Sequence, residues 1–111
     1  MALVTHHNTW PWGETVTFII SDGAGTVDMS FDKSNPAVCY ISGLSVIPEK
    51  RRQNLGLMLM EECINYCQKR GIFRIDLNSV QEGWLMDFYH KLGFKDIEES
   101  EGFMRMYKML R

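Results

Sequence analysis

The first half of the chain has the hydrophobic pattern of β-strands. Residues 15–20 are rich in β-branched and aromatic side chains, and residues 26–32 alternate polar and apolar side chains with a period of two. The turn-forming residues 22–25 lie between them, so this region predicts a β-hairpin with one solvated face. A third strand is expected over residues 38–47. Its end, residues 44–47, is almost continuously apolar, which favours a central strand covered on both faces.

After Pro48 the apolar spacing becomes helical. Leu55, Leu59 and Cys63 recur every four residues, which predicts a helix over residues 54–70 that ends at Gly71. A strand over residues 72–77, a second helix over residues 83–92 and two strands within residues 94–110 complete the pattern. Strand, helix and strand in succession predict a right-handed crossover between parallel strands. The fold class is therefore α+β, a mixed α/β sandwich of order β-β-β-α-β-α-β-β.

Length and charge narrow the possible functions. The 111 residues fit a single domain, 1–111, and the net charge of −2 gives no electrostatic reason to expect nucleic acid or an anionic membrane as a partner. No apolar run approaches the roughly 20 residues of a membrane helix, and the N-terminus lacks the pattern of a signal peptide. An odd number of cysteines outside a disulfide framework indicates a reducing compartment, so we expect a cytoplasmic protein.

One segment combines the features of an anion site. Residues 46–56 lead from a strand through the basic residues Lys50, Arg51 and Arg52 into the start of a helix. A helix N-terminus has unpaired N–H groups and about half a positive charge. Asn54 tolerates left-handed backbone geometry, and Gly56 lets a ligand approach the backbone. A phosphate or pyrophosphate site is predicted here, with a solvated basic loop as the alternative.

A second segment, residues 88–94, reads Phe-Tyr-His-Lys-Leu-Gly-Phe. Taken alone it is an amphipathic helix that ends at a glycine, with Tyr89 as a boundary residue. Together, however, residues 46–56 and 88–94 resemble the two motifs of the GNAT superfamily of acyl-CoA N-acyltransferases. The first matches its pyrophosphate loop, Arg/Gln-x-x-Gly-x-Gly/Ala, and the second its Phe/Leu-Tyr-x-Lys-x-Gly-Phe motif. The resemblance covers about residues 16–110.

The resemblance implies a fold, a reaction and a set of site residues. The fold would be GNAT-like, and the reaction would transfer an acetyl group from acetyl-CoA to a primary amine in a ternary complex, without a metal. Tyr89 would protonate the departing thiolate, and a backbone N–H near Val46 would bind the oxyanion. The resemblance places the cofactor on Leu44, Ser45, Val46, Arg51, Arg52, Gln53, Asn54, Leu55, Gly56 and Leu57.

Three departures from the family pattern leave alternatives open. Asn54 stands at the first loop glycine, and Glu82 and Leu85 replace an asparagine and an alanine before the tyrosine motif. Only residues 1–14 precede the hairpin, where the family usually has a strand and two helices. The acceptor side would then be open or completed by a second subunit, and we expect a homodimer. The rival interpretations are a non-catalytic CoA-binding or protein-interaction module and a binder of another phosphate ligand.

Several other side chains have more than one interpretation. The base that deprotonates the acceptor is left open between Asp76, Glu82 and a water chain held by Ser42 or Asn78. Cys63 and Cys67 are expected in the core rather than on a metal, and His6 and His7 in a flexible terminus. Trp10 and Trp12 could cap the core, line an acceptor cleft or enter a dimer interface.

Overall fold

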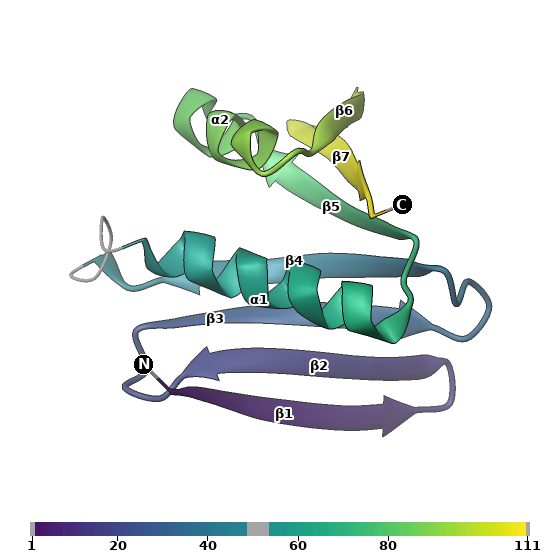
Figure 1. Ribbon diagram of the computed structural model, residues 1–111. Helices are drawn as coiled ribbons and strands as arrows, with labels where there is room; N and C mark the ends of the chain where they lie inside the picture. Colours follow the sequence, from purple (N-terminus) through teal and green to yellow (C-terminus); the bar gives the residue numbers. More distant parts are fainter. Residues whose placement is uncertain (1, 49–53, 111) are drawn as a thin grey trace.

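The computed structural model describes residues 2–48 and 54–110, and in this part of the chain seven strands form one sheet with two helices (Figure 1). The sheet order is β1-β2-β3-β4-β5-β7-β6, and all neighbours are antiparallel except the parallel pair β4 and β5. The elements, in chain order, are β1 (Leu3–Trp10), β2 (Gly13–Ile20), β3 (Gly25–Asp32), β4 (Val38–Val46), α1 (Leu55–Arg70), β5 (Arg74–Val80), α2 (Gly83–Lys91), β6 (Lys95–Ser100) and β7 (Phe103–Met109).

The predicted fold class is confirmed, and the predicted order of elements is found from β2 onward. α1 connects the parallel strands β4 and β5, as the crossover prediction requires. Helix α1 ends at Gly71, whose φ of 82° is the left-handed conformation that glycine adopts most readily. The strand after α1 begins at Arg74, two residues later than predicted.

One strand was not predicted. β1 pairs along its whole length with β2, so His6 and His7 lie in an ordered edge strand and the expectation of a flexible terminus is wrong. The two histidines also point to opposite faces of the sheet, because side chains alternate along a strand. After Leu3 every residue of β1 is exposed. An edge strand of this kind has no alternating burial, and hence no alternating hydrophobicity that would reveal it.

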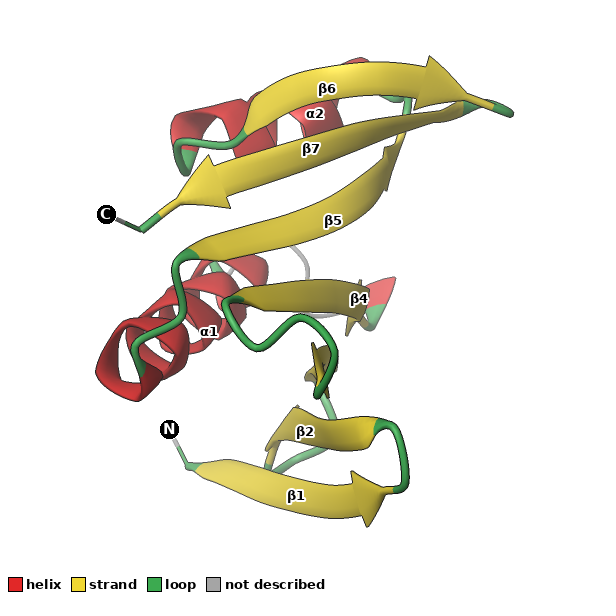
Figure 2. Ribbon diagram, turned by 90° about the vertical axis from the view of Figure 1, so that its right-hand side faces the viewer, coloured by secondary structure: helices red, strands yellow, loops and turns green. Residues whose placement is uncertain are grey.

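Both helices pack on the same face of the sheet, where the core lies (Figure 2). Leu59, Cys63 and Cys67 of α1 are fully buried in one cluster with Cys39 of β4 and Ile75 of β5. The cysteines are therefore core residues, as predicted. A hydrogen bond with Cys67, together with burial, raises the pKa of the Cys39 thiol, and burial raises that of Cys63. These thiols are neutral at physiological pH.

In the described residues no helix covers the opposite face, which we call the open face. Along β4, Cys39 and Ile41 are buried, whereas Tyr40 and Ser42 are exposed on the open face. The prediction that this strand is covered on both faces is therefore wrong. The apolar run that suggested it occupies the end of β4, where pairing with β5 has already stopped.

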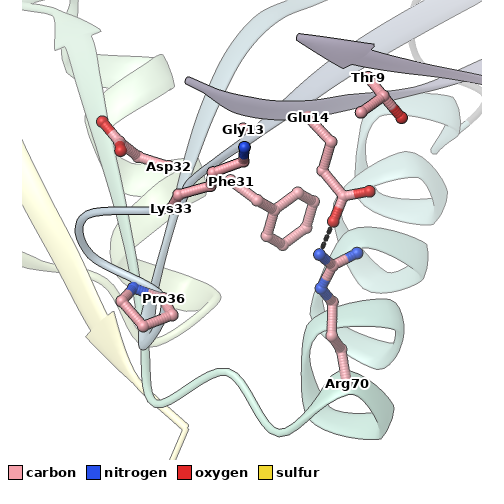
Figure 3. A pocket seen from close by; sticks show the side chains of 8 residues that line it. All are labelled: Thr9, Gly13, Glu14, Phe31, Asp32, Lys33, Pro36 and Arg70. Atoms are coloured by element: carbon pink, nitrogen blue, oxygen red, sulfur yellow. Dashed lines mark ion pairs between the residues drawn. The ribbon is translucent and has the colours of Figure 1, made fainter. Parts of the chain in front are cut away.

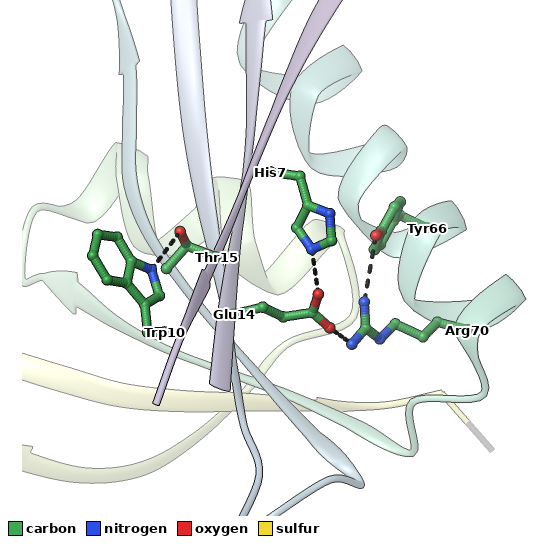
Figure 4. A network of polar contacts seen from close by, with 6 residues as sticks. All are labelled: His7, Trp10, Glu14, Thr15, Tyr66 and Arg70. Atoms are coloured by element: carbon green, nitrogen blue, oxygen red, sulfur yellow. Dashed lines mark hydrogen bonds and ion pairs between the residues drawn. The ribbon is translucent and has the colours of Figure 1, made fainter. Parts of the chain in front are cut away.

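The C-terminal end of α1 is fastened to the edge of the sheet by polar contacts (Figure 4). The Glu14 carboxylate of β2 pairs with Arg70 of α1 on one side and with His7 of β1 on the other. Arg70 Nη1 also donates a hydrogen bond of 3.4 Å to the Tyr66 hydroxyl, and its guanidinium lies 4.1 Å from the centroid of the Phe31 ring. Neither α1 nor α2 is long and apolar enough to span a membrane, so far as the described chain goes.

Candidate active site

The two parallel strands at the centre of the sheet pair over a short distance and then diverge. β4 and β5 are joined only from Val38–Arg74 to Ile41–Leu77, and Figure 1 shows them separating beyond that point, toward the start of α1. On its other edge, the pairing of β4 with β3 is irregular at the same position along the strand. Thr26 pairs with Ser45 but Asp28 pairs with Ser42, so three steps along β4 match two along β3. This β-bulge interrupts the regular pleat where the parallel pairing ends.

Gly43 lies within the bulge and has a φ of 64°. A methyl group added to it would lie 2.7 Å from Asp28 Oδ2 on β3. Both the left-handed backbone and the lack of space require glycine here. The Thr17 hydroxyl of β2 donates a hydrogen bond of 2.6 Å to the other carboxylate oxygen, Asp28 Oδ1. The Asp28 carboxylate is thereby held over the bulge.

The start of α1 has the geometry of an anion site. Asn54 precedes the helix with φ 58° and ψ 23°, which is the left-handed conformation, and its side chain makes no capping hydrogen bond. The first intrahelical donor is the N–H of Met58, which bonds the Asn54 carbonyl at 3.0 Å. The N–H groups of Leu55, Gly56 and Leu57 therefore have no carbonyl partner within the helix. No acidic residue lies in the first turn to compete for them.

The predicted cofactor residues fall in two neighbouring segments. Leu44, Ser45 and Val46 form the end of β4 beyond its pairing with β5, and Ser45 is the exposed one of the three. Asn54, Leu55, Gly56 and Leu57 form the start of α1, with Leu55 buried and Leu57 exposed. Arg51, Arg52 and Gln53 lie outside the described residues.

The second motif lies directly beside the first. A Cβ on Gly56 would be 3.7 Å from the Phe88 ring, so the first turn of α1 contacts α2. Tyr89, the next residue, is 6% exposed, and its ring centroid lies 5.3 Å from that of Phe88 and 5.8 Å from that of Phe94. Burial raises the pKa of the Tyr89 phenol above its ordinary value of 10.0. The phenol is therefore protonated across the neutral pH range.

The two aromatic residues of this motif differ in burial. Phe88 is half-buried and packs against the core, and Tyr89 is the more buried of the two. The reason is the chain reversal after α2. The N–H of Phe94 bonds the Tyr89 carbonyl at 3.1 Å, which brings the Phe94 ring onto the tyrosine.

The carboxylates considered as proton acceptors are engaged elsewhere. Arg74 Nη2 donates a hydrogen bond of 2.8 Å to Asp76 Oδ2, and its Nε lies 2.8 Å from Asp76 Oδ1. Glu82 accepts a 2.8 Å hydrogen bond from the Trp84 indole. Asp28, which lies nearest the bulge, was missed. Alternation assigns it to the solvated face of a strand, but no sequence signal locates the β4 bulge opposite it.

A cavity of the described chain lies away from these residues. It has a volume of about 390 Å³ and surrounds the Glu14–Arg70 ion pair at the C-terminal end of α1 (Figure 3). A second, of about 280 Å³, is on the open face and includes Tyr40 of β4 and Asp76 of β5. No cluster of three potential metal-binding side chains occurs within residues 2–48 and 54–110.

The family of the chain follows from a comparison with known proteins. The acetyltransferase (GNAT) family matches residues 5–94. The chain belongs to the GNAT family. It is also 32% identical, over 74 residues, to an uncharacterized N-acetyltransferase of Methanocaldococcus jannaschii. That alignment covers 66% of this chain and 33% of the relative, so the chain spans about a third of the length of that protein.

Solved structures share the GNAT fold of the chain. An acetyltransferase from Bacillus subtilis in complex with CoA superposes with a TM-score of 0.71 at 17% identity, covering 99% of this chain and 100% of that one. The PaiA N-acetyltransferase of Thermoplasma acidophilum in complex with coenzyme A gives a TM-score of 0.72 at 21% identity, covering 86% and 59%. The resemblance drawn from residues 46–56 and 88–94 is thus confirmed at the level of family and fold.

Proposed function

We propose that this GNAT protein transfers an acetyl group from acetyl-CoA to a primary amine by direct attack in a ternary complex. One observation carries the proposal: the first turn of α1, whose N–H groups have no carbonyl partner within the helix, contacts the helix that holds Tyr89, at the end where β4 and β5 diverge. Transfer from an acyl-CoA needs groups that bind the pyrophosphate and a group that protonates the thiolate, and candidates for both lie on these two contacting helices. The CoA in the two superposable GNAT structures supports the same donor class.

The cofactor would bind to both predicted segments, the start of α1 and the end of β4. Its pyrophosphate would lie on the amides from Arg52 to Leu57, where the helix dipole favours an anion. The left-handed backbone of Asn54 supports this, because Asn54 adopts the conformation that the family's loop glycine would. The pantetheine arm would bond the backbone of Leu44–Val46 as an added strand, at the edge of β4 that β5 leaves.

Two groups of the chain would then act on the reacting atoms. The neutral acceptor amine attacks the thioester carbonyl, and a backbone N–H of the segment Leu44–Val46, at the end of β4, stabilises the oxyanion. Tyr89 gives its phenolic proton to the sulfur as the carbon–sulfur bond breaks. The raised pKa supports this role, because the proton stays on the phenol until a thiolate forms beside it.

The main alternative is a non-catalytic GNAT module that binds CoA or acts through protein contacts. The absence of any helix over the open face in the described chain supports it. A buried, protonated phenol on the helix that contacts the first turn of α1 favours the enzyme, because a binding module has no need of a proton donor.

Assembly and location are proposals as well. A homodimer would cover apolar side chains that the subunit leaves exposed, among them Trp10 at 44% and Trp12 at 46% exposure. A monomeric mass in sedimentation equilibrium at tens of micromolar protein would contradict it. The three free, buried thiols support a cytoplasmic location.

Two measurements test the proposed reaction. Native mass spectrometry of the protein mixed with acetyl-CoA should show a one-to-one complex. Thiol release from acetyl-CoA, measured with a panel of primary amines, should then identify at least one acceptor. Firm CoA binding without turnover on any amine would favour the non-catalytic CoA-binding module. Absence of CoA binding would contradict both the enzyme and the CoA-binding module, and would leave a module that acts through protein contacts.

A further inference from the structure

We propose that Asp28 binds the ammonium group of the acceptor and accepts its proton. This inference rests on the proposed acetyl transfer, and it supplies the base which that reaction needs. It depends on where the fold places one carboxylate relative to the bulge of β4 and on what holds the carboxylate there.

The position of Asp28 follows from strand register. Asp28 on β3 pairs with Ser42 on β4, one residue beyond Ile41, where pairing between β4 and β5 stops. Its Oδ2 lies over Gly43, two residues past that last pair, or about 7 Å along the strand. The segment Leu44–Val46, proposed to bind the pantetheine arm, begins immediately afterward. The carboxylate is therefore close to where the thioester end of that arm would lie.

The direction of approach also fits an acceptor. Asp28 lies on the open face, opposite the face on which α1 and α2 pack. A cofactor bound to the start of α1 and an amine arriving over the open face would reach the diverging strands from opposite sides. Such an arrangement allows both to be bound at once, as a ternary complex requires.

Two neighbours fix the carboxylate in place. The Thr17 hydroxyl donates to Oδ1 at 2.6 Å, which leaves Oδ2 directed at Gly43. Any larger residue at position 43 would push the carboxylate away, since its Cβ would lie 2.7 Å from Oδ2. Unlike Asp76, Asp28 forms no ion pair with an arginine or lysine of the described chain. Its negative charge is therefore available to an incoming ammonium.

The proton balance of the step is simple. A primary alkylamine has a pKa of about 10, so it arrives as an ammonium at neutral pH and cannot attack until one N–H proton leaves. Asp28 Oδ2 takes that proton and later releases it to water. The nitrogen forms the amide bond and loses its second proton, the carbon–sulfur bond breaks, and the thiolate takes the Tyr89 proton. The second N–H proton, carried by water, restores the Tyr89 phenol, so the net products are the amide, the free thiol of CoA and one proton released to water. The titratable and charged groups on the open face of neighbouring strands are His6 on β1, Asp32 on β3 itself, Tyr40 on β4, and Arg74 with Asp76 on β5.

Kinetics of the variant Asp28→Asn test the inference. With an amine found in the thiol-release screen, kcat/KM should fall by about 10²-fold or more, while affinity for CoA stays within twofold. The residual kcat/KM should rise about tenfold per pH unit below the pKa of the amine, because only free amine can then react. The parent should show a shallower rise. A structural role alone would lower kcat/KM equally at every pH.

Two further variants complete the kinetic test. Thr17→Val removes only the hydrogen bond that positions Asp28, so its loss should be smaller and its pH profile intermediate. Asp96→Asn, at an exposed aspartate of β6 that pairs with His90, removes the same charge elsewhere and should leave kcat/KM unchanged. Parental kcat/KM and pH profile in Asp28→Asn would overturn the inference.

A binding measurement needs no turnover. Amide resonances of Thr17, Asp28 and Gly43 should shift when n-butylammonium chloride is added to the CoA-saturated protein, and not when n-butanol is added. Asp28→Asn should abolish the shifts. Absence of shifts in the parent would overturn the inference, whatever the kinetics. Shifts without turnover on any amine would contradict the proposed acetyl transfer while leaving ammonium binding by Asp28 in place.

Discussion

The two ends of α1 use the same backbone conformation for different purposes. Asn54 before the helix and Gly71 after it are both left-handed, with φ of 58° and 82°. At the C-terminal end the groups around that residue are satisfied internally. The N–H groups of Gly71 and Ile72 bond the carbonyls of Gln68 and Cys67, and Arg70 is held by Glu14 and the Phe31 ring. The contacts at the C-terminal end of α1 therefore stabilise the fold.

The N-terminal end has the opposite character. Asn54 makes no capping bond, and the first turn holds no acidic residue. The contact of Gly56 with Phe88 places α2, the helix that holds Tyr89, beside this end, whereas the C-terminal end is closed by an ion-pair network. We therefore expect ligand chemistry at the end of α1 whose first N–H groups have no carbonyl partner within the helix, and a structural role at the end that the ion-pair network closes.

Of the substitutions that test this difference, Tyr89→Phe should have the largest effect, and the effect should be on kcat. The change keeps the buried ring and removes the proton, so kcat should fall by about 10²–10⁴-fold while CoA affinity barely changes. Tyr66→Phe removes the same atom near the C-terminal end, where the hydroxyl only accepts a 3.4 Å hydrogen bond from Arg70, and should leave kcat unchanged. Equal rates for the parent and Tyr89→Phe would exclude the phenol from the reaction.

Replacing Gly56 with Val should weaken CoA binding by at least about tenfold, or about 1.4 kcal/mol, because the side chain blocks approach of the pyrophosphate to the helix amides. The nearest side chain would be in ordinary contact at 3.7 Å from a Cβ, so the fold should persist. Gly83→Val is the matched control, since it adds the same side chain at the first residue of α2, where nothing lies within 4 Å. Calorimetry that gave the same CoA affinity for Gly56→Val and the parent would mean that the pyrophosphate site is wrongly placed.

Substitutions at the C-terminal end of α1 should change the free energy of unfolding and leave the affinity for CoA unchanged. Arg70→Met removes an ion pair and a cation–π contact, and we expect the free energy of unfolding to fall by about 1–2 kcal/mol, the lower value if solvent screens the pair. Arg105→Met breaks the more exposed pair with Glu98, 2.9 Å long, and should lose less than about 0.5 kcal/mol. Urea titration measures both. A loss of CoA affinity in Arg70→Met would remove the distinction between the two ends.

The sequence predicts most of the fold because most elements bury one face. The spacing of Leu55, Leu59 and Cys63 located α1, and the alternation around Met29 located β3. β1 could not be found in this way, because it is an exposed edge strand in which only Leu3 packs against the core.

For the candidate site, local residue types were informative and long-range register was not. Asn54 was recognised as a residue that tolerates left-handed geometry, and its φ confirms this. Asp28 was missed because its placement depends on a bulge fifteen residues away in sequence, at Gly43, which no local pattern marks. The burial of Tyr89 likewise depends on the return of the chain at Phe94.

The smallest effects should come from the two left-handed residues themselves. Asn54→Ala and Gly71→Ala each place alanine in a conformation that it disfavours, so each should lower the free energy of unfolding by about 1 kcal/mol. Only Asn54→Ala should also weaken CoA binding, because relaxing position 54 turns the N–H groups of the first helical turn away from the pyrophosphate. Asn54→Gly keeps the conformation available and should retain CoA affinity. If Asn54→Ala and Gly71→Ala changed CoA affinity alike, the two ends of α1 would not differ in the way described.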